Sequence, residues 1–194
     1  MTESYAGPLG DEPLAVELHN TLYARSGKLV DGLTTARSAR AWLDALADRL
    51  PPQGRGRLPT RPELIQLRDR VREVLHAALD GETFSRPSLD AINRISADAP
   101  RSPVARWRPA GPPVADVDVH GASRAEVLLA VIAADTIELV TGPRREALRA
   151  CGAPGCVLLF VKDHPRREWC SAACGNRARQ ARYYARTRHR HPTR

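Results

Sequence analysis

All four cysteines of the 194-residue chain lie in one stretch near its C-terminal end. They form two closely spaced pairs, Cys151 with Cys156 and Cys170 with Cys174, and 13 residues separate the pairs. Each short pair can supply half of a tetrahedral zinc site, and the segment between the pairs must fold back to join the halves. The spacing therefore predicts one structural zinc ion held by these four thiolates, with no open position for a catalytic water.

Two other uses of four cysteines compete with zinc. Two disulfides would need an oxidising compartment. Residues 1–7 lack the basic start and apolar core of a secretory signal, and the longest apolar run, Val127 to Ala134, is too short to span a membrane. We therefore expect a cytoplasmic protein with reduced thiols and no membrane partner. An iron–sulfur cluster also uses four thiolates and stays open as an alternative.

The whole chain has a net charge of +8. Its positive charge is concentrated in the same C-terminal part that holds the cysteines. Residues 1–143 carry 17 basic and 19 acidic side chains, whereas residues 144–194 carry 13 basic and 3 acidic ones, so the C-terminal piece holds all of the positive excess. A basic segment beside a metal fold favours a polyanion-binding surface, and a solvated basic tail is the alternative. With the break at Thr141-Gly142-Pro143, the pattern predicts two domains, 1–142 and 143–194.

The last helix is expected to present arginines along one side. At 100° per residue, four of them fall within a stripe of about 80° and are candidate DNA contacts: Arg179, Arg182, Arg186 and Arg190. Arg177 points the other way and is either a further DNA contact or a cation that offsets the negative charge of the thiolates. Asn176 is expected to bond a thiolate or cap the local backbone. A solvated arginine face is the alternative for the whole stripe.

The first 142 residues favour a mainly helical domain. Apolar residues recur at helical spacing, and the predicted helices are residues 13–24, a segment after the cap Thr35, a segment from Thr60 to Gly81, a segment capped by Ser88, and one opened by Ser123. The helix from Ser123 contains an all-apolar run and is expected to lie at the centre of the domain. Segments 104–107 and 114–119 predict a small hairpin. No metal, phosphate or nucleophile motif is evident, and His19, His76 and His120 are isolated in the sequence.

The C-terminal piece predicts a small α+β module. Residues 144–150 favour a short helix, residues 157–161 a strand, residues 163–165 a turn and residues 166–169 a second strand. Cys170 and Cys174 would share one face of the first turn of the last helix. A knuckle, a hairpin and a helix start make a treble-clef-like zinc module, so the fold class is mainly α with an α+β C-terminal module.

Residues 151–188 resemble the CGNR zinc finger, which is named for the sequence found here at Cys174-Gly175-Asn176-Arg177. The family pattern also matches at Phe160, Asp163, Arg167, Trp169, Cys170 and Ser171. Segments 14–21, 30–33 and 42–43 are similar to the opening of the ABATE domain, the usual N-terminal partner of this finger. The resemblance implies a bacterial, stress-induced transcription regulator.

The sequence therefore predicts a zinc-dependent, DNA-binding transcriptional regulator that is not an enzyme. Its N-terminal domain would respond to a small-molecule or protein effector or mediate assembly, for example as a homodimer. An RNA-binding protein using the same helix and a protein-interaction module with purely structural zinc are the alternatives.

Overall fold

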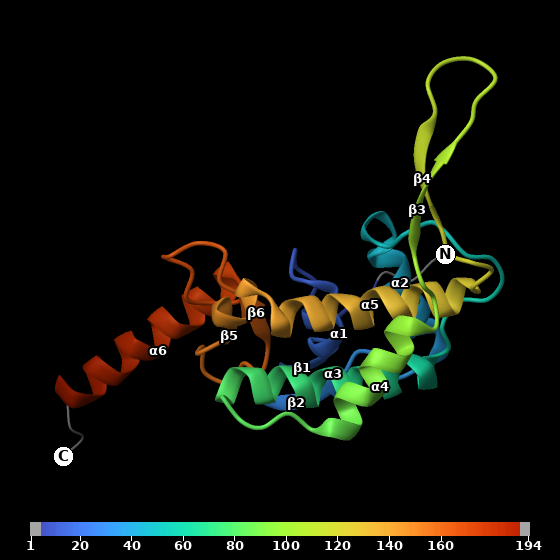
Figure 1. Cartoon of the computed structure of the whole chain (residues 1–194). Helices are drawn as coiled ribbons and strands as arrows, with labels where there is room; N and C mark the ends of the chain where they lie inside the picture. The colour runs from blue at the N-terminus through green and yellow to red at the C-terminus, as the bar shows by residue number, and fades with distance from the viewer. Residues whose placement is uncertain (1–4, 191–194) are drawn as a thin grey trace.

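The helical core is built around α5 (Arg124–Thr141), which packs against α1 (Leu14–His19), α3 (Arg61–Asp80) and α4 (Arg86–Ala97) (Figure 1). The computed structural model of the protein describes residues 5–190, and the side-chain surroundings of residues 5–186. Nine residues of α5 are buried, as expected for a helix with an all-apolar segment. The predicted central place of this helix is confirmed.

Three helices begin at the cap residues that the sequence indicates, Thr35, Thr60 and Ser123. The hydroxyls of Thr60 and Ser123 accept hydrogen bonds from the backbone three residues on, and the glutamates there bond back. Thr35 makes the same reciprocal arrangement with Ser38. Gly81, with φ at 69°, ends α3 in the left-handed conformation that glycine adopts without strain. The Thr35 box begins α2 (Ala36–Ala45). A short 3-10 helix, η1 (Ala47–Arg49), follows α2.

The prediction of a helix over residues 13–24 is wrong in its second half. The helix ends at His19, and the chain continues into a hairpin of β1 (Leu22–Arg25) and β2 (Lys28–Asp31). Ser26 and Gly27 form its two-residue turn with φ values of 51° and 74°. A pair of residues with positive φ matches the twist of the two strands, so this turn favours the hairpin over a longer helix.

The fourth helix begins earlier than predicted. Ser85, and not Ser88, precedes the first residue of α4, and Pro87 occupies the first turn, where its missing N–H costs nothing. Ser88 is buried, and its hydroxyl donates to the Glu73 carboxylate of α3. Its side chain therefore joins two helices.

The predicted hairpin after α4 is present as β3 (Ser102–Arg106) and β4 (Val114–Asp118), paired antiparallel. Figure 1 shows it standing clear of the helices, at the end of the molecule opposite α6 (Ala172–Arg190). None of the described helices is both long and apolar enough to cross a membrane.

The C-terminal part begins with a 3-10 helix, η2 (Pro143–Ala147), and a hairpin of β5 (Leu148–Ala150) and β6 (Leu159–Val161). The predicted helix over residues 144–150 is therefore half 3-10 helix and half strand. All three residues of β6 are buried, and their side chains alternate between two sides. Leu159 and Val161 join the main helical core, whereas Phe160 joins the cluster around the cysteines. One strand thus separates two adjoining cores.

The predicted second strand over residues 166–169 is wrong. The strand partner of β6 is β5, and residues 166–169 run from a turn through irregular chain into a bend. Side chains from the N-terminal segment lie along the other edge of β6, because Asn20 bonds both the N–H and the carbonyl of Leu159 and Glu12 accepts from the N–H of Val161. No edge remains for a further strand.

Candidate metal centre

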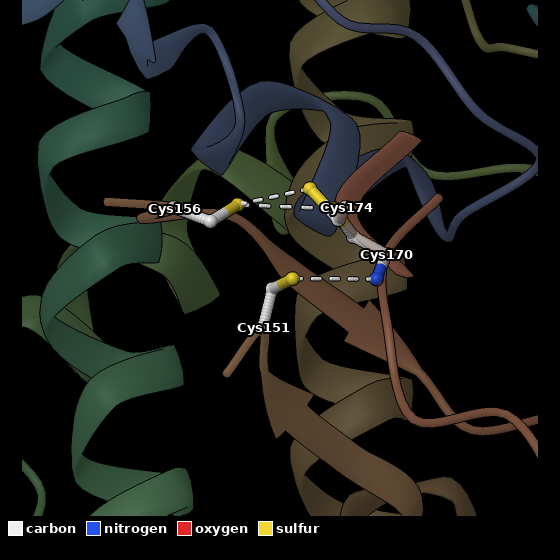
Figure 2. Close-up of side chains that lie close together, drawn as sticks. All are labelled: Cys151, Cys156, Cys170 and Cys174. Carbon is white, nitrogen blue, oxygen red and sulfur yellow. Dashed lines mark hydrogen bonds between the residues drawn. The ribbon is translucent and has the colours of Figure 1, made fainter. Parts of the chain in front are cut away.

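The fold brings the four cysteine sulfurs into one cluster, in which all of them lie within 4.8 Å of one another (Figure 2). The Sγ atom of Cys174 is 3.4 Å from that of Cys170 and 3.8 Å from that of Cys156, and the sulfurs of Cys156 and Cys170 are also 3.8 Å apart. The edge of a sulfur tetrahedron with Zn–S bonds of about 2.3 Å is about 3.8 Å. The donor set and its spacing therefore fit zinc, and all four cysteines are free thiols and not disulfides.

The thiols strongly influence one another's pKa values. The hydrogen bond with Cys170 lowers the pKa of Cys156 to about 5, and the same bond, with burial, raises the pKa of Cys170. Burial also raises the pKa of Cys151. A metal binds the thiolate and must displace any proton that a thiol holds, so metal affinity falls as the pH falls.

The two ligand pairs come from different local structures. Cys151 directly follows β5, and Cys156 ends the turn that Gly155 allows with a φ of 70°. Cys170 lies just before α6 and Cys174 lies in its first turn, so the helix starts two residues later than predicted. The Ser171 hydroxyl accepts from the Cys174 N–H and caps the helix start.

Arg177, Asn176 and Arg182, which lie beside the cysteine cluster, make different contacts. Arg177 donates to the Cys174 sulfur at 3.2 Å, in accord with the expected balancing of thiolate charge. The expected bond from Asn176 to a sulfur is absent among the described residues, and its side-chain oxygen accepts from Arg179. The Arg182 guanidinium lies 5.7 Å from the centre of the Trp169 ring, over its face.

The candidate DNA contacts share one exposed helix but differ in their surroundings. Arg179, Arg182 and Arg186 are exposed, and the first two are steadied by Asn176 and Trp169. Arg190 lies within α6, but its side chain is outside the part of the chain whose surroundings are described. Figure 1 shows α6 projecting from the body. The arginines are therefore presented to solvent and not packed against the helical core.

Sequence reasoning did not assign Glu12 and Asn20 to this site. Both side chains are buried, and their hydrogen-bond partners include backbone groups of β6. Glu12 also pairs with Arg167. In the sequence both residues simply flank the apolar stripe of the first helix, so no pattern indicates contacts with residues about 140 positions away.

Two of the three histidines that are isolated in the sequence meet in the fold. His19 on α1 is fully buried, and its Nε2 atom lies 3.2 Å from that of His76 on α3. Burial, and then the nearby Arg72 guanidinium, lower the pKa of His19 to about 3. Among the described residues, the histidines join no group able to hold a metal.

Comparison with protein families gives matches over nearly the whole chain. A family model named ABATE, described as "Putative stress-induced transcription regulator", matches residues 12–143, and the CGNR zinc finger model matches residues 147–187. None of the curated proteins matches the chain. The finger match and the four-cysteine cluster together fit one structural zinc ion. Because the first match covers more than half of the chain, the chain belongs to the ABATE family, with a CGNR zinc finger at its C-terminal end.

Proposed function

We propose that the chain is a transcriptional regulator that binds duplex DNA through α6. The observation that carries the proposal is an exposed, arginine-rich helix that begins at the cysteine cluster. Residues 144–194 hold 13 basic and only 3 acidic side chains, a density typical of surfaces that bind phosphates. The description of the ABATE family supports a regulatory role.

The arginine stripe could follow a phosphate backbone, with one or two side chains reaching base edges. Arg179 and Arg182 are already held by Asn176 and Trp169, so less side-chain freedom is lost when they bind a phosphate. Ala181 and Ala185 are exposed small residues that keep the helix narrow enough to approach a groove. Arg177 is occupied with the Cys174 sulfur, so we propose it as a minor DNA contact.

Zinc would be held by Cys151, Cys156, Cys170 and Cys174. Bound there, it supplies folding free energy and no catalysis, because four thiolates fill its coordination sphere. The chain would then be a binding protein and not an enzyme. We place it in the cytoplasm, where thiols stay reduced.

Replacing Arg179, Arg182 and Arg186 together by Ala tests the proposal. If each neutralises one phosphate, the slope of log affinity against log salt should flatten by about 2.7, at about 0.9 per contact. The measurement is binding of random duplex DNA across a salt series, by fluorescence anisotropy.

A charge-matched control removes the exposed arginines Arg55, Arg101 and Arg108 of the helical part. Its salt slope should change much less. A triple α6 variant that keeps its zinc and binds duplex DNA with unchanged affinity and slope would exclude α6 as the DNA-binding surface and favour the protein-interaction module. Tighter binding of single-stranded RNA than of duplex DNA by the unaltered chain would favour the RNA-binding alternative.

For the effector we propose a cavity of about 520 Å³ where α4, the end of α5 and η2 meet. Phe84, Leu89 and Val140 give it apolar walls, and Arg145, whose guanidinium lies over Phe84, adds a cation. Because η2 leads directly into β5, a molecule bound there would contact the connection to the zinc module. The regulator could also act as a homodimer. A measured mass in solution of twice that of one chain would show this.

A further inference from the structure

The N-terminal segment completes one edge of the strand beside the metal centre. The Asn20 carboxamide donates to the carbonyl of Leu159 at 2.9 Å and accepts from its N–H at 2.9 Å. The Glu12 carboxylate accepts from the N–H of Val161 at 2.8 Å. Both residues are buried, with exposures of 5% for Asn20 and 6% for Glu12. They thus satisfy successive outward-facing backbone groups of β6, as a neighbouring strand would.

A second connection runs through Arg167. Its guanidinium pairs with Glu12, donates to the carbonyl of Val161 at 3.0 Å and to that of Cys170 at 3.3 Å, and lies 4.8 Å from the centre of the Phe160 ring. Glu12 therefore reaches the backbone of a metal-binding cysteine through one intervening side chain. Bonds to a buried charge are strong, and they hold Arg167 in one orientation.

These contacts bear on both ligand pairs. Leu159, which Asn20 holds, follows Cys156 by three residues, and Arg167 holds the carbonyl of Cys170. Leu148, Leu159 and Val161 also lie in the main helical core. Loss of the N-terminal contacts would leave buried backbone groups of β6 without partners, so the hairpin would separate from that core.

We propose that Glu12 and Asn20 are positioning residues of the metal centre, so that zinc affinity depends on docking of β6 against the helical domain. By thermodynamic reciprocity, zinc must then stabilise the helical domain by the same coupling free energy. This inference does not depend on what α6 binds.

The first experiment compares zinc affinity of full-length variants. Asn20→Leu keeps the size of the side chain but removes both bonds to Leu159, and Glu12→Gln removes the charge that pairs with Arg167. Competition for zinc with a chromogenic chelator should show an apparent Kd raised about 10- to 100-fold, the range typical when the supports of ligating residues are removed. Thr136→Val is the matched control, because Thr136 is also buried and its hydroxyl bonds only within α5.

The second experiment separates positioning from general loss of stability. Thermal unfolding of the helices, followed by circular dichroism with zinc and with excess chelator, gives the increase in Tm due to zinc. This increase should shrink in Asn20→Leu and Glu12→Gln and persist in Thr136→Val. If Glu12 acts through Arg167, adding Glu12→Gln to Arg167→Gln should cost little further affinity.

Folded variants with the zinc affinity and zinc-induced Tm increase of the unaltered chain would overturn the proposal. If Asn20→Leu does not fold, Glu12→Gln decides, because its amide can still accept from Val161 and preserve the fold.

Discussion

Gly175 lies where the first turn of α6 meets the Trp169 ring. A Cβ atom at this position would stand 2.9 Å from Cδ1 of that ring, closer than carbon atoms tolerate. Glycine is otherwise unfavourable inside a helix by about 1 kcal/mol relative to alanine. The close approach of Trp169, which packs in the cluster of cysteines, therefore explains a glycine at this point of the CGNR signature.

We predict that Gly175→Ala destabilises the zinc module despite the better helix propensity of alanine. Overpacking typically costs about 1–3 kcal/mol, which exceeds the gain of about 1 kcal/mol. Displacement of Trp169 should shift the tryptophan emission, and chelator competition should show weaker zinc binding. Gln180→Ala, at an exposed position of the same helix, should change neither the tryptophan emission nor the zinc affinity. If Gly175→Ala also left both unchanged, the close packing of Trp169 would not be the reason for the glycine.

At the scale of elements, the helices were predictable because their signals are local. The boxes at Thr60 and Ser123 and the apolar periodicity after them fix where α3 and α5 start. The four cysteines were also predictable as one cluster, since their spacing is a property of the sequence alone. Most of the fold and the centre of the candidate site could thus be derived from residues close in the chain.

The wrongly expected second strand has a tertiary cause. Residues 157–161 read as a strand, but the sequence does not say what covers each edge. The partners are β5, which directly follows a 3-10 helix, and the distant side chains Glu12 and Asn20. Such tertiary contacts override local preference, which is why residues 166–169 were wrongly expected to pair. The error in the first helix has a local cause instead, because the Ser26–Gly27 turn outweighs the apolar stripe.

The contact between α1 and α3 predicts a pH dependence. The pKa of His19 is about 3 in the fold, below its ordinary value of about 6.5, so the unfolded chain takes up a proton first as the pH falls. Its stabilising contribution is complete above pH 6.5 and is lost as the pH falls towards 3. Between pH 6.5 and pH 5 this loss should amount to about 1–2 kcal/mol of unfolding free energy.

His19→Gln should remove this part of the dependence in urea unfolding at saturating zinc. His120→Gln is the control, because His120 lies on the surface and its ring bonds the hydroxyl of Ser102. An identical slope of stability against pH in the unaltered chain and in His19→Gln would show that this histidine does not set the dependence.

Over the whole molecule, the helical part and the zinc module share one core. Leu148, Leu159 and Val161 lie in the same buried cluster as residues of α1, α3 and α5. The proposed division at residues 142 and 143 follows the change in charge, and the family matches change over between residues 143 and 147. The packing nevertheless continues across that point.

We predict that a fragment of residues 1–143 is much less stable than the helices of the full chain. Three buried side chains are removed from its core, and each is worth about 1.5–3 kcal/mol. The midpoint of urea unfolding should fall accordingly, and the fragment, with its net negative charge, should bind little DNA. The full chain lacking the three α6 arginines should keep the original midpoint of urea unfolding. If the fragment also unfolded at that midpoint, the shared packing would contribute little to stability.

The edge of β6 also bears on how such a finger can be inherited. A zinc finger that folds alone can be transferred by recombination into unrelated proteins. This finger instead needs the Glu12 carboxylate and the Asn20 carboxamide, which lie about 140 residues upstream. Recombination that joins it to an unrelated domain would leave that edge bare. We therefore expect transplantation of residues 143–194 into another protein to succeed only where the host offers equivalents of Glu12 and Asn20.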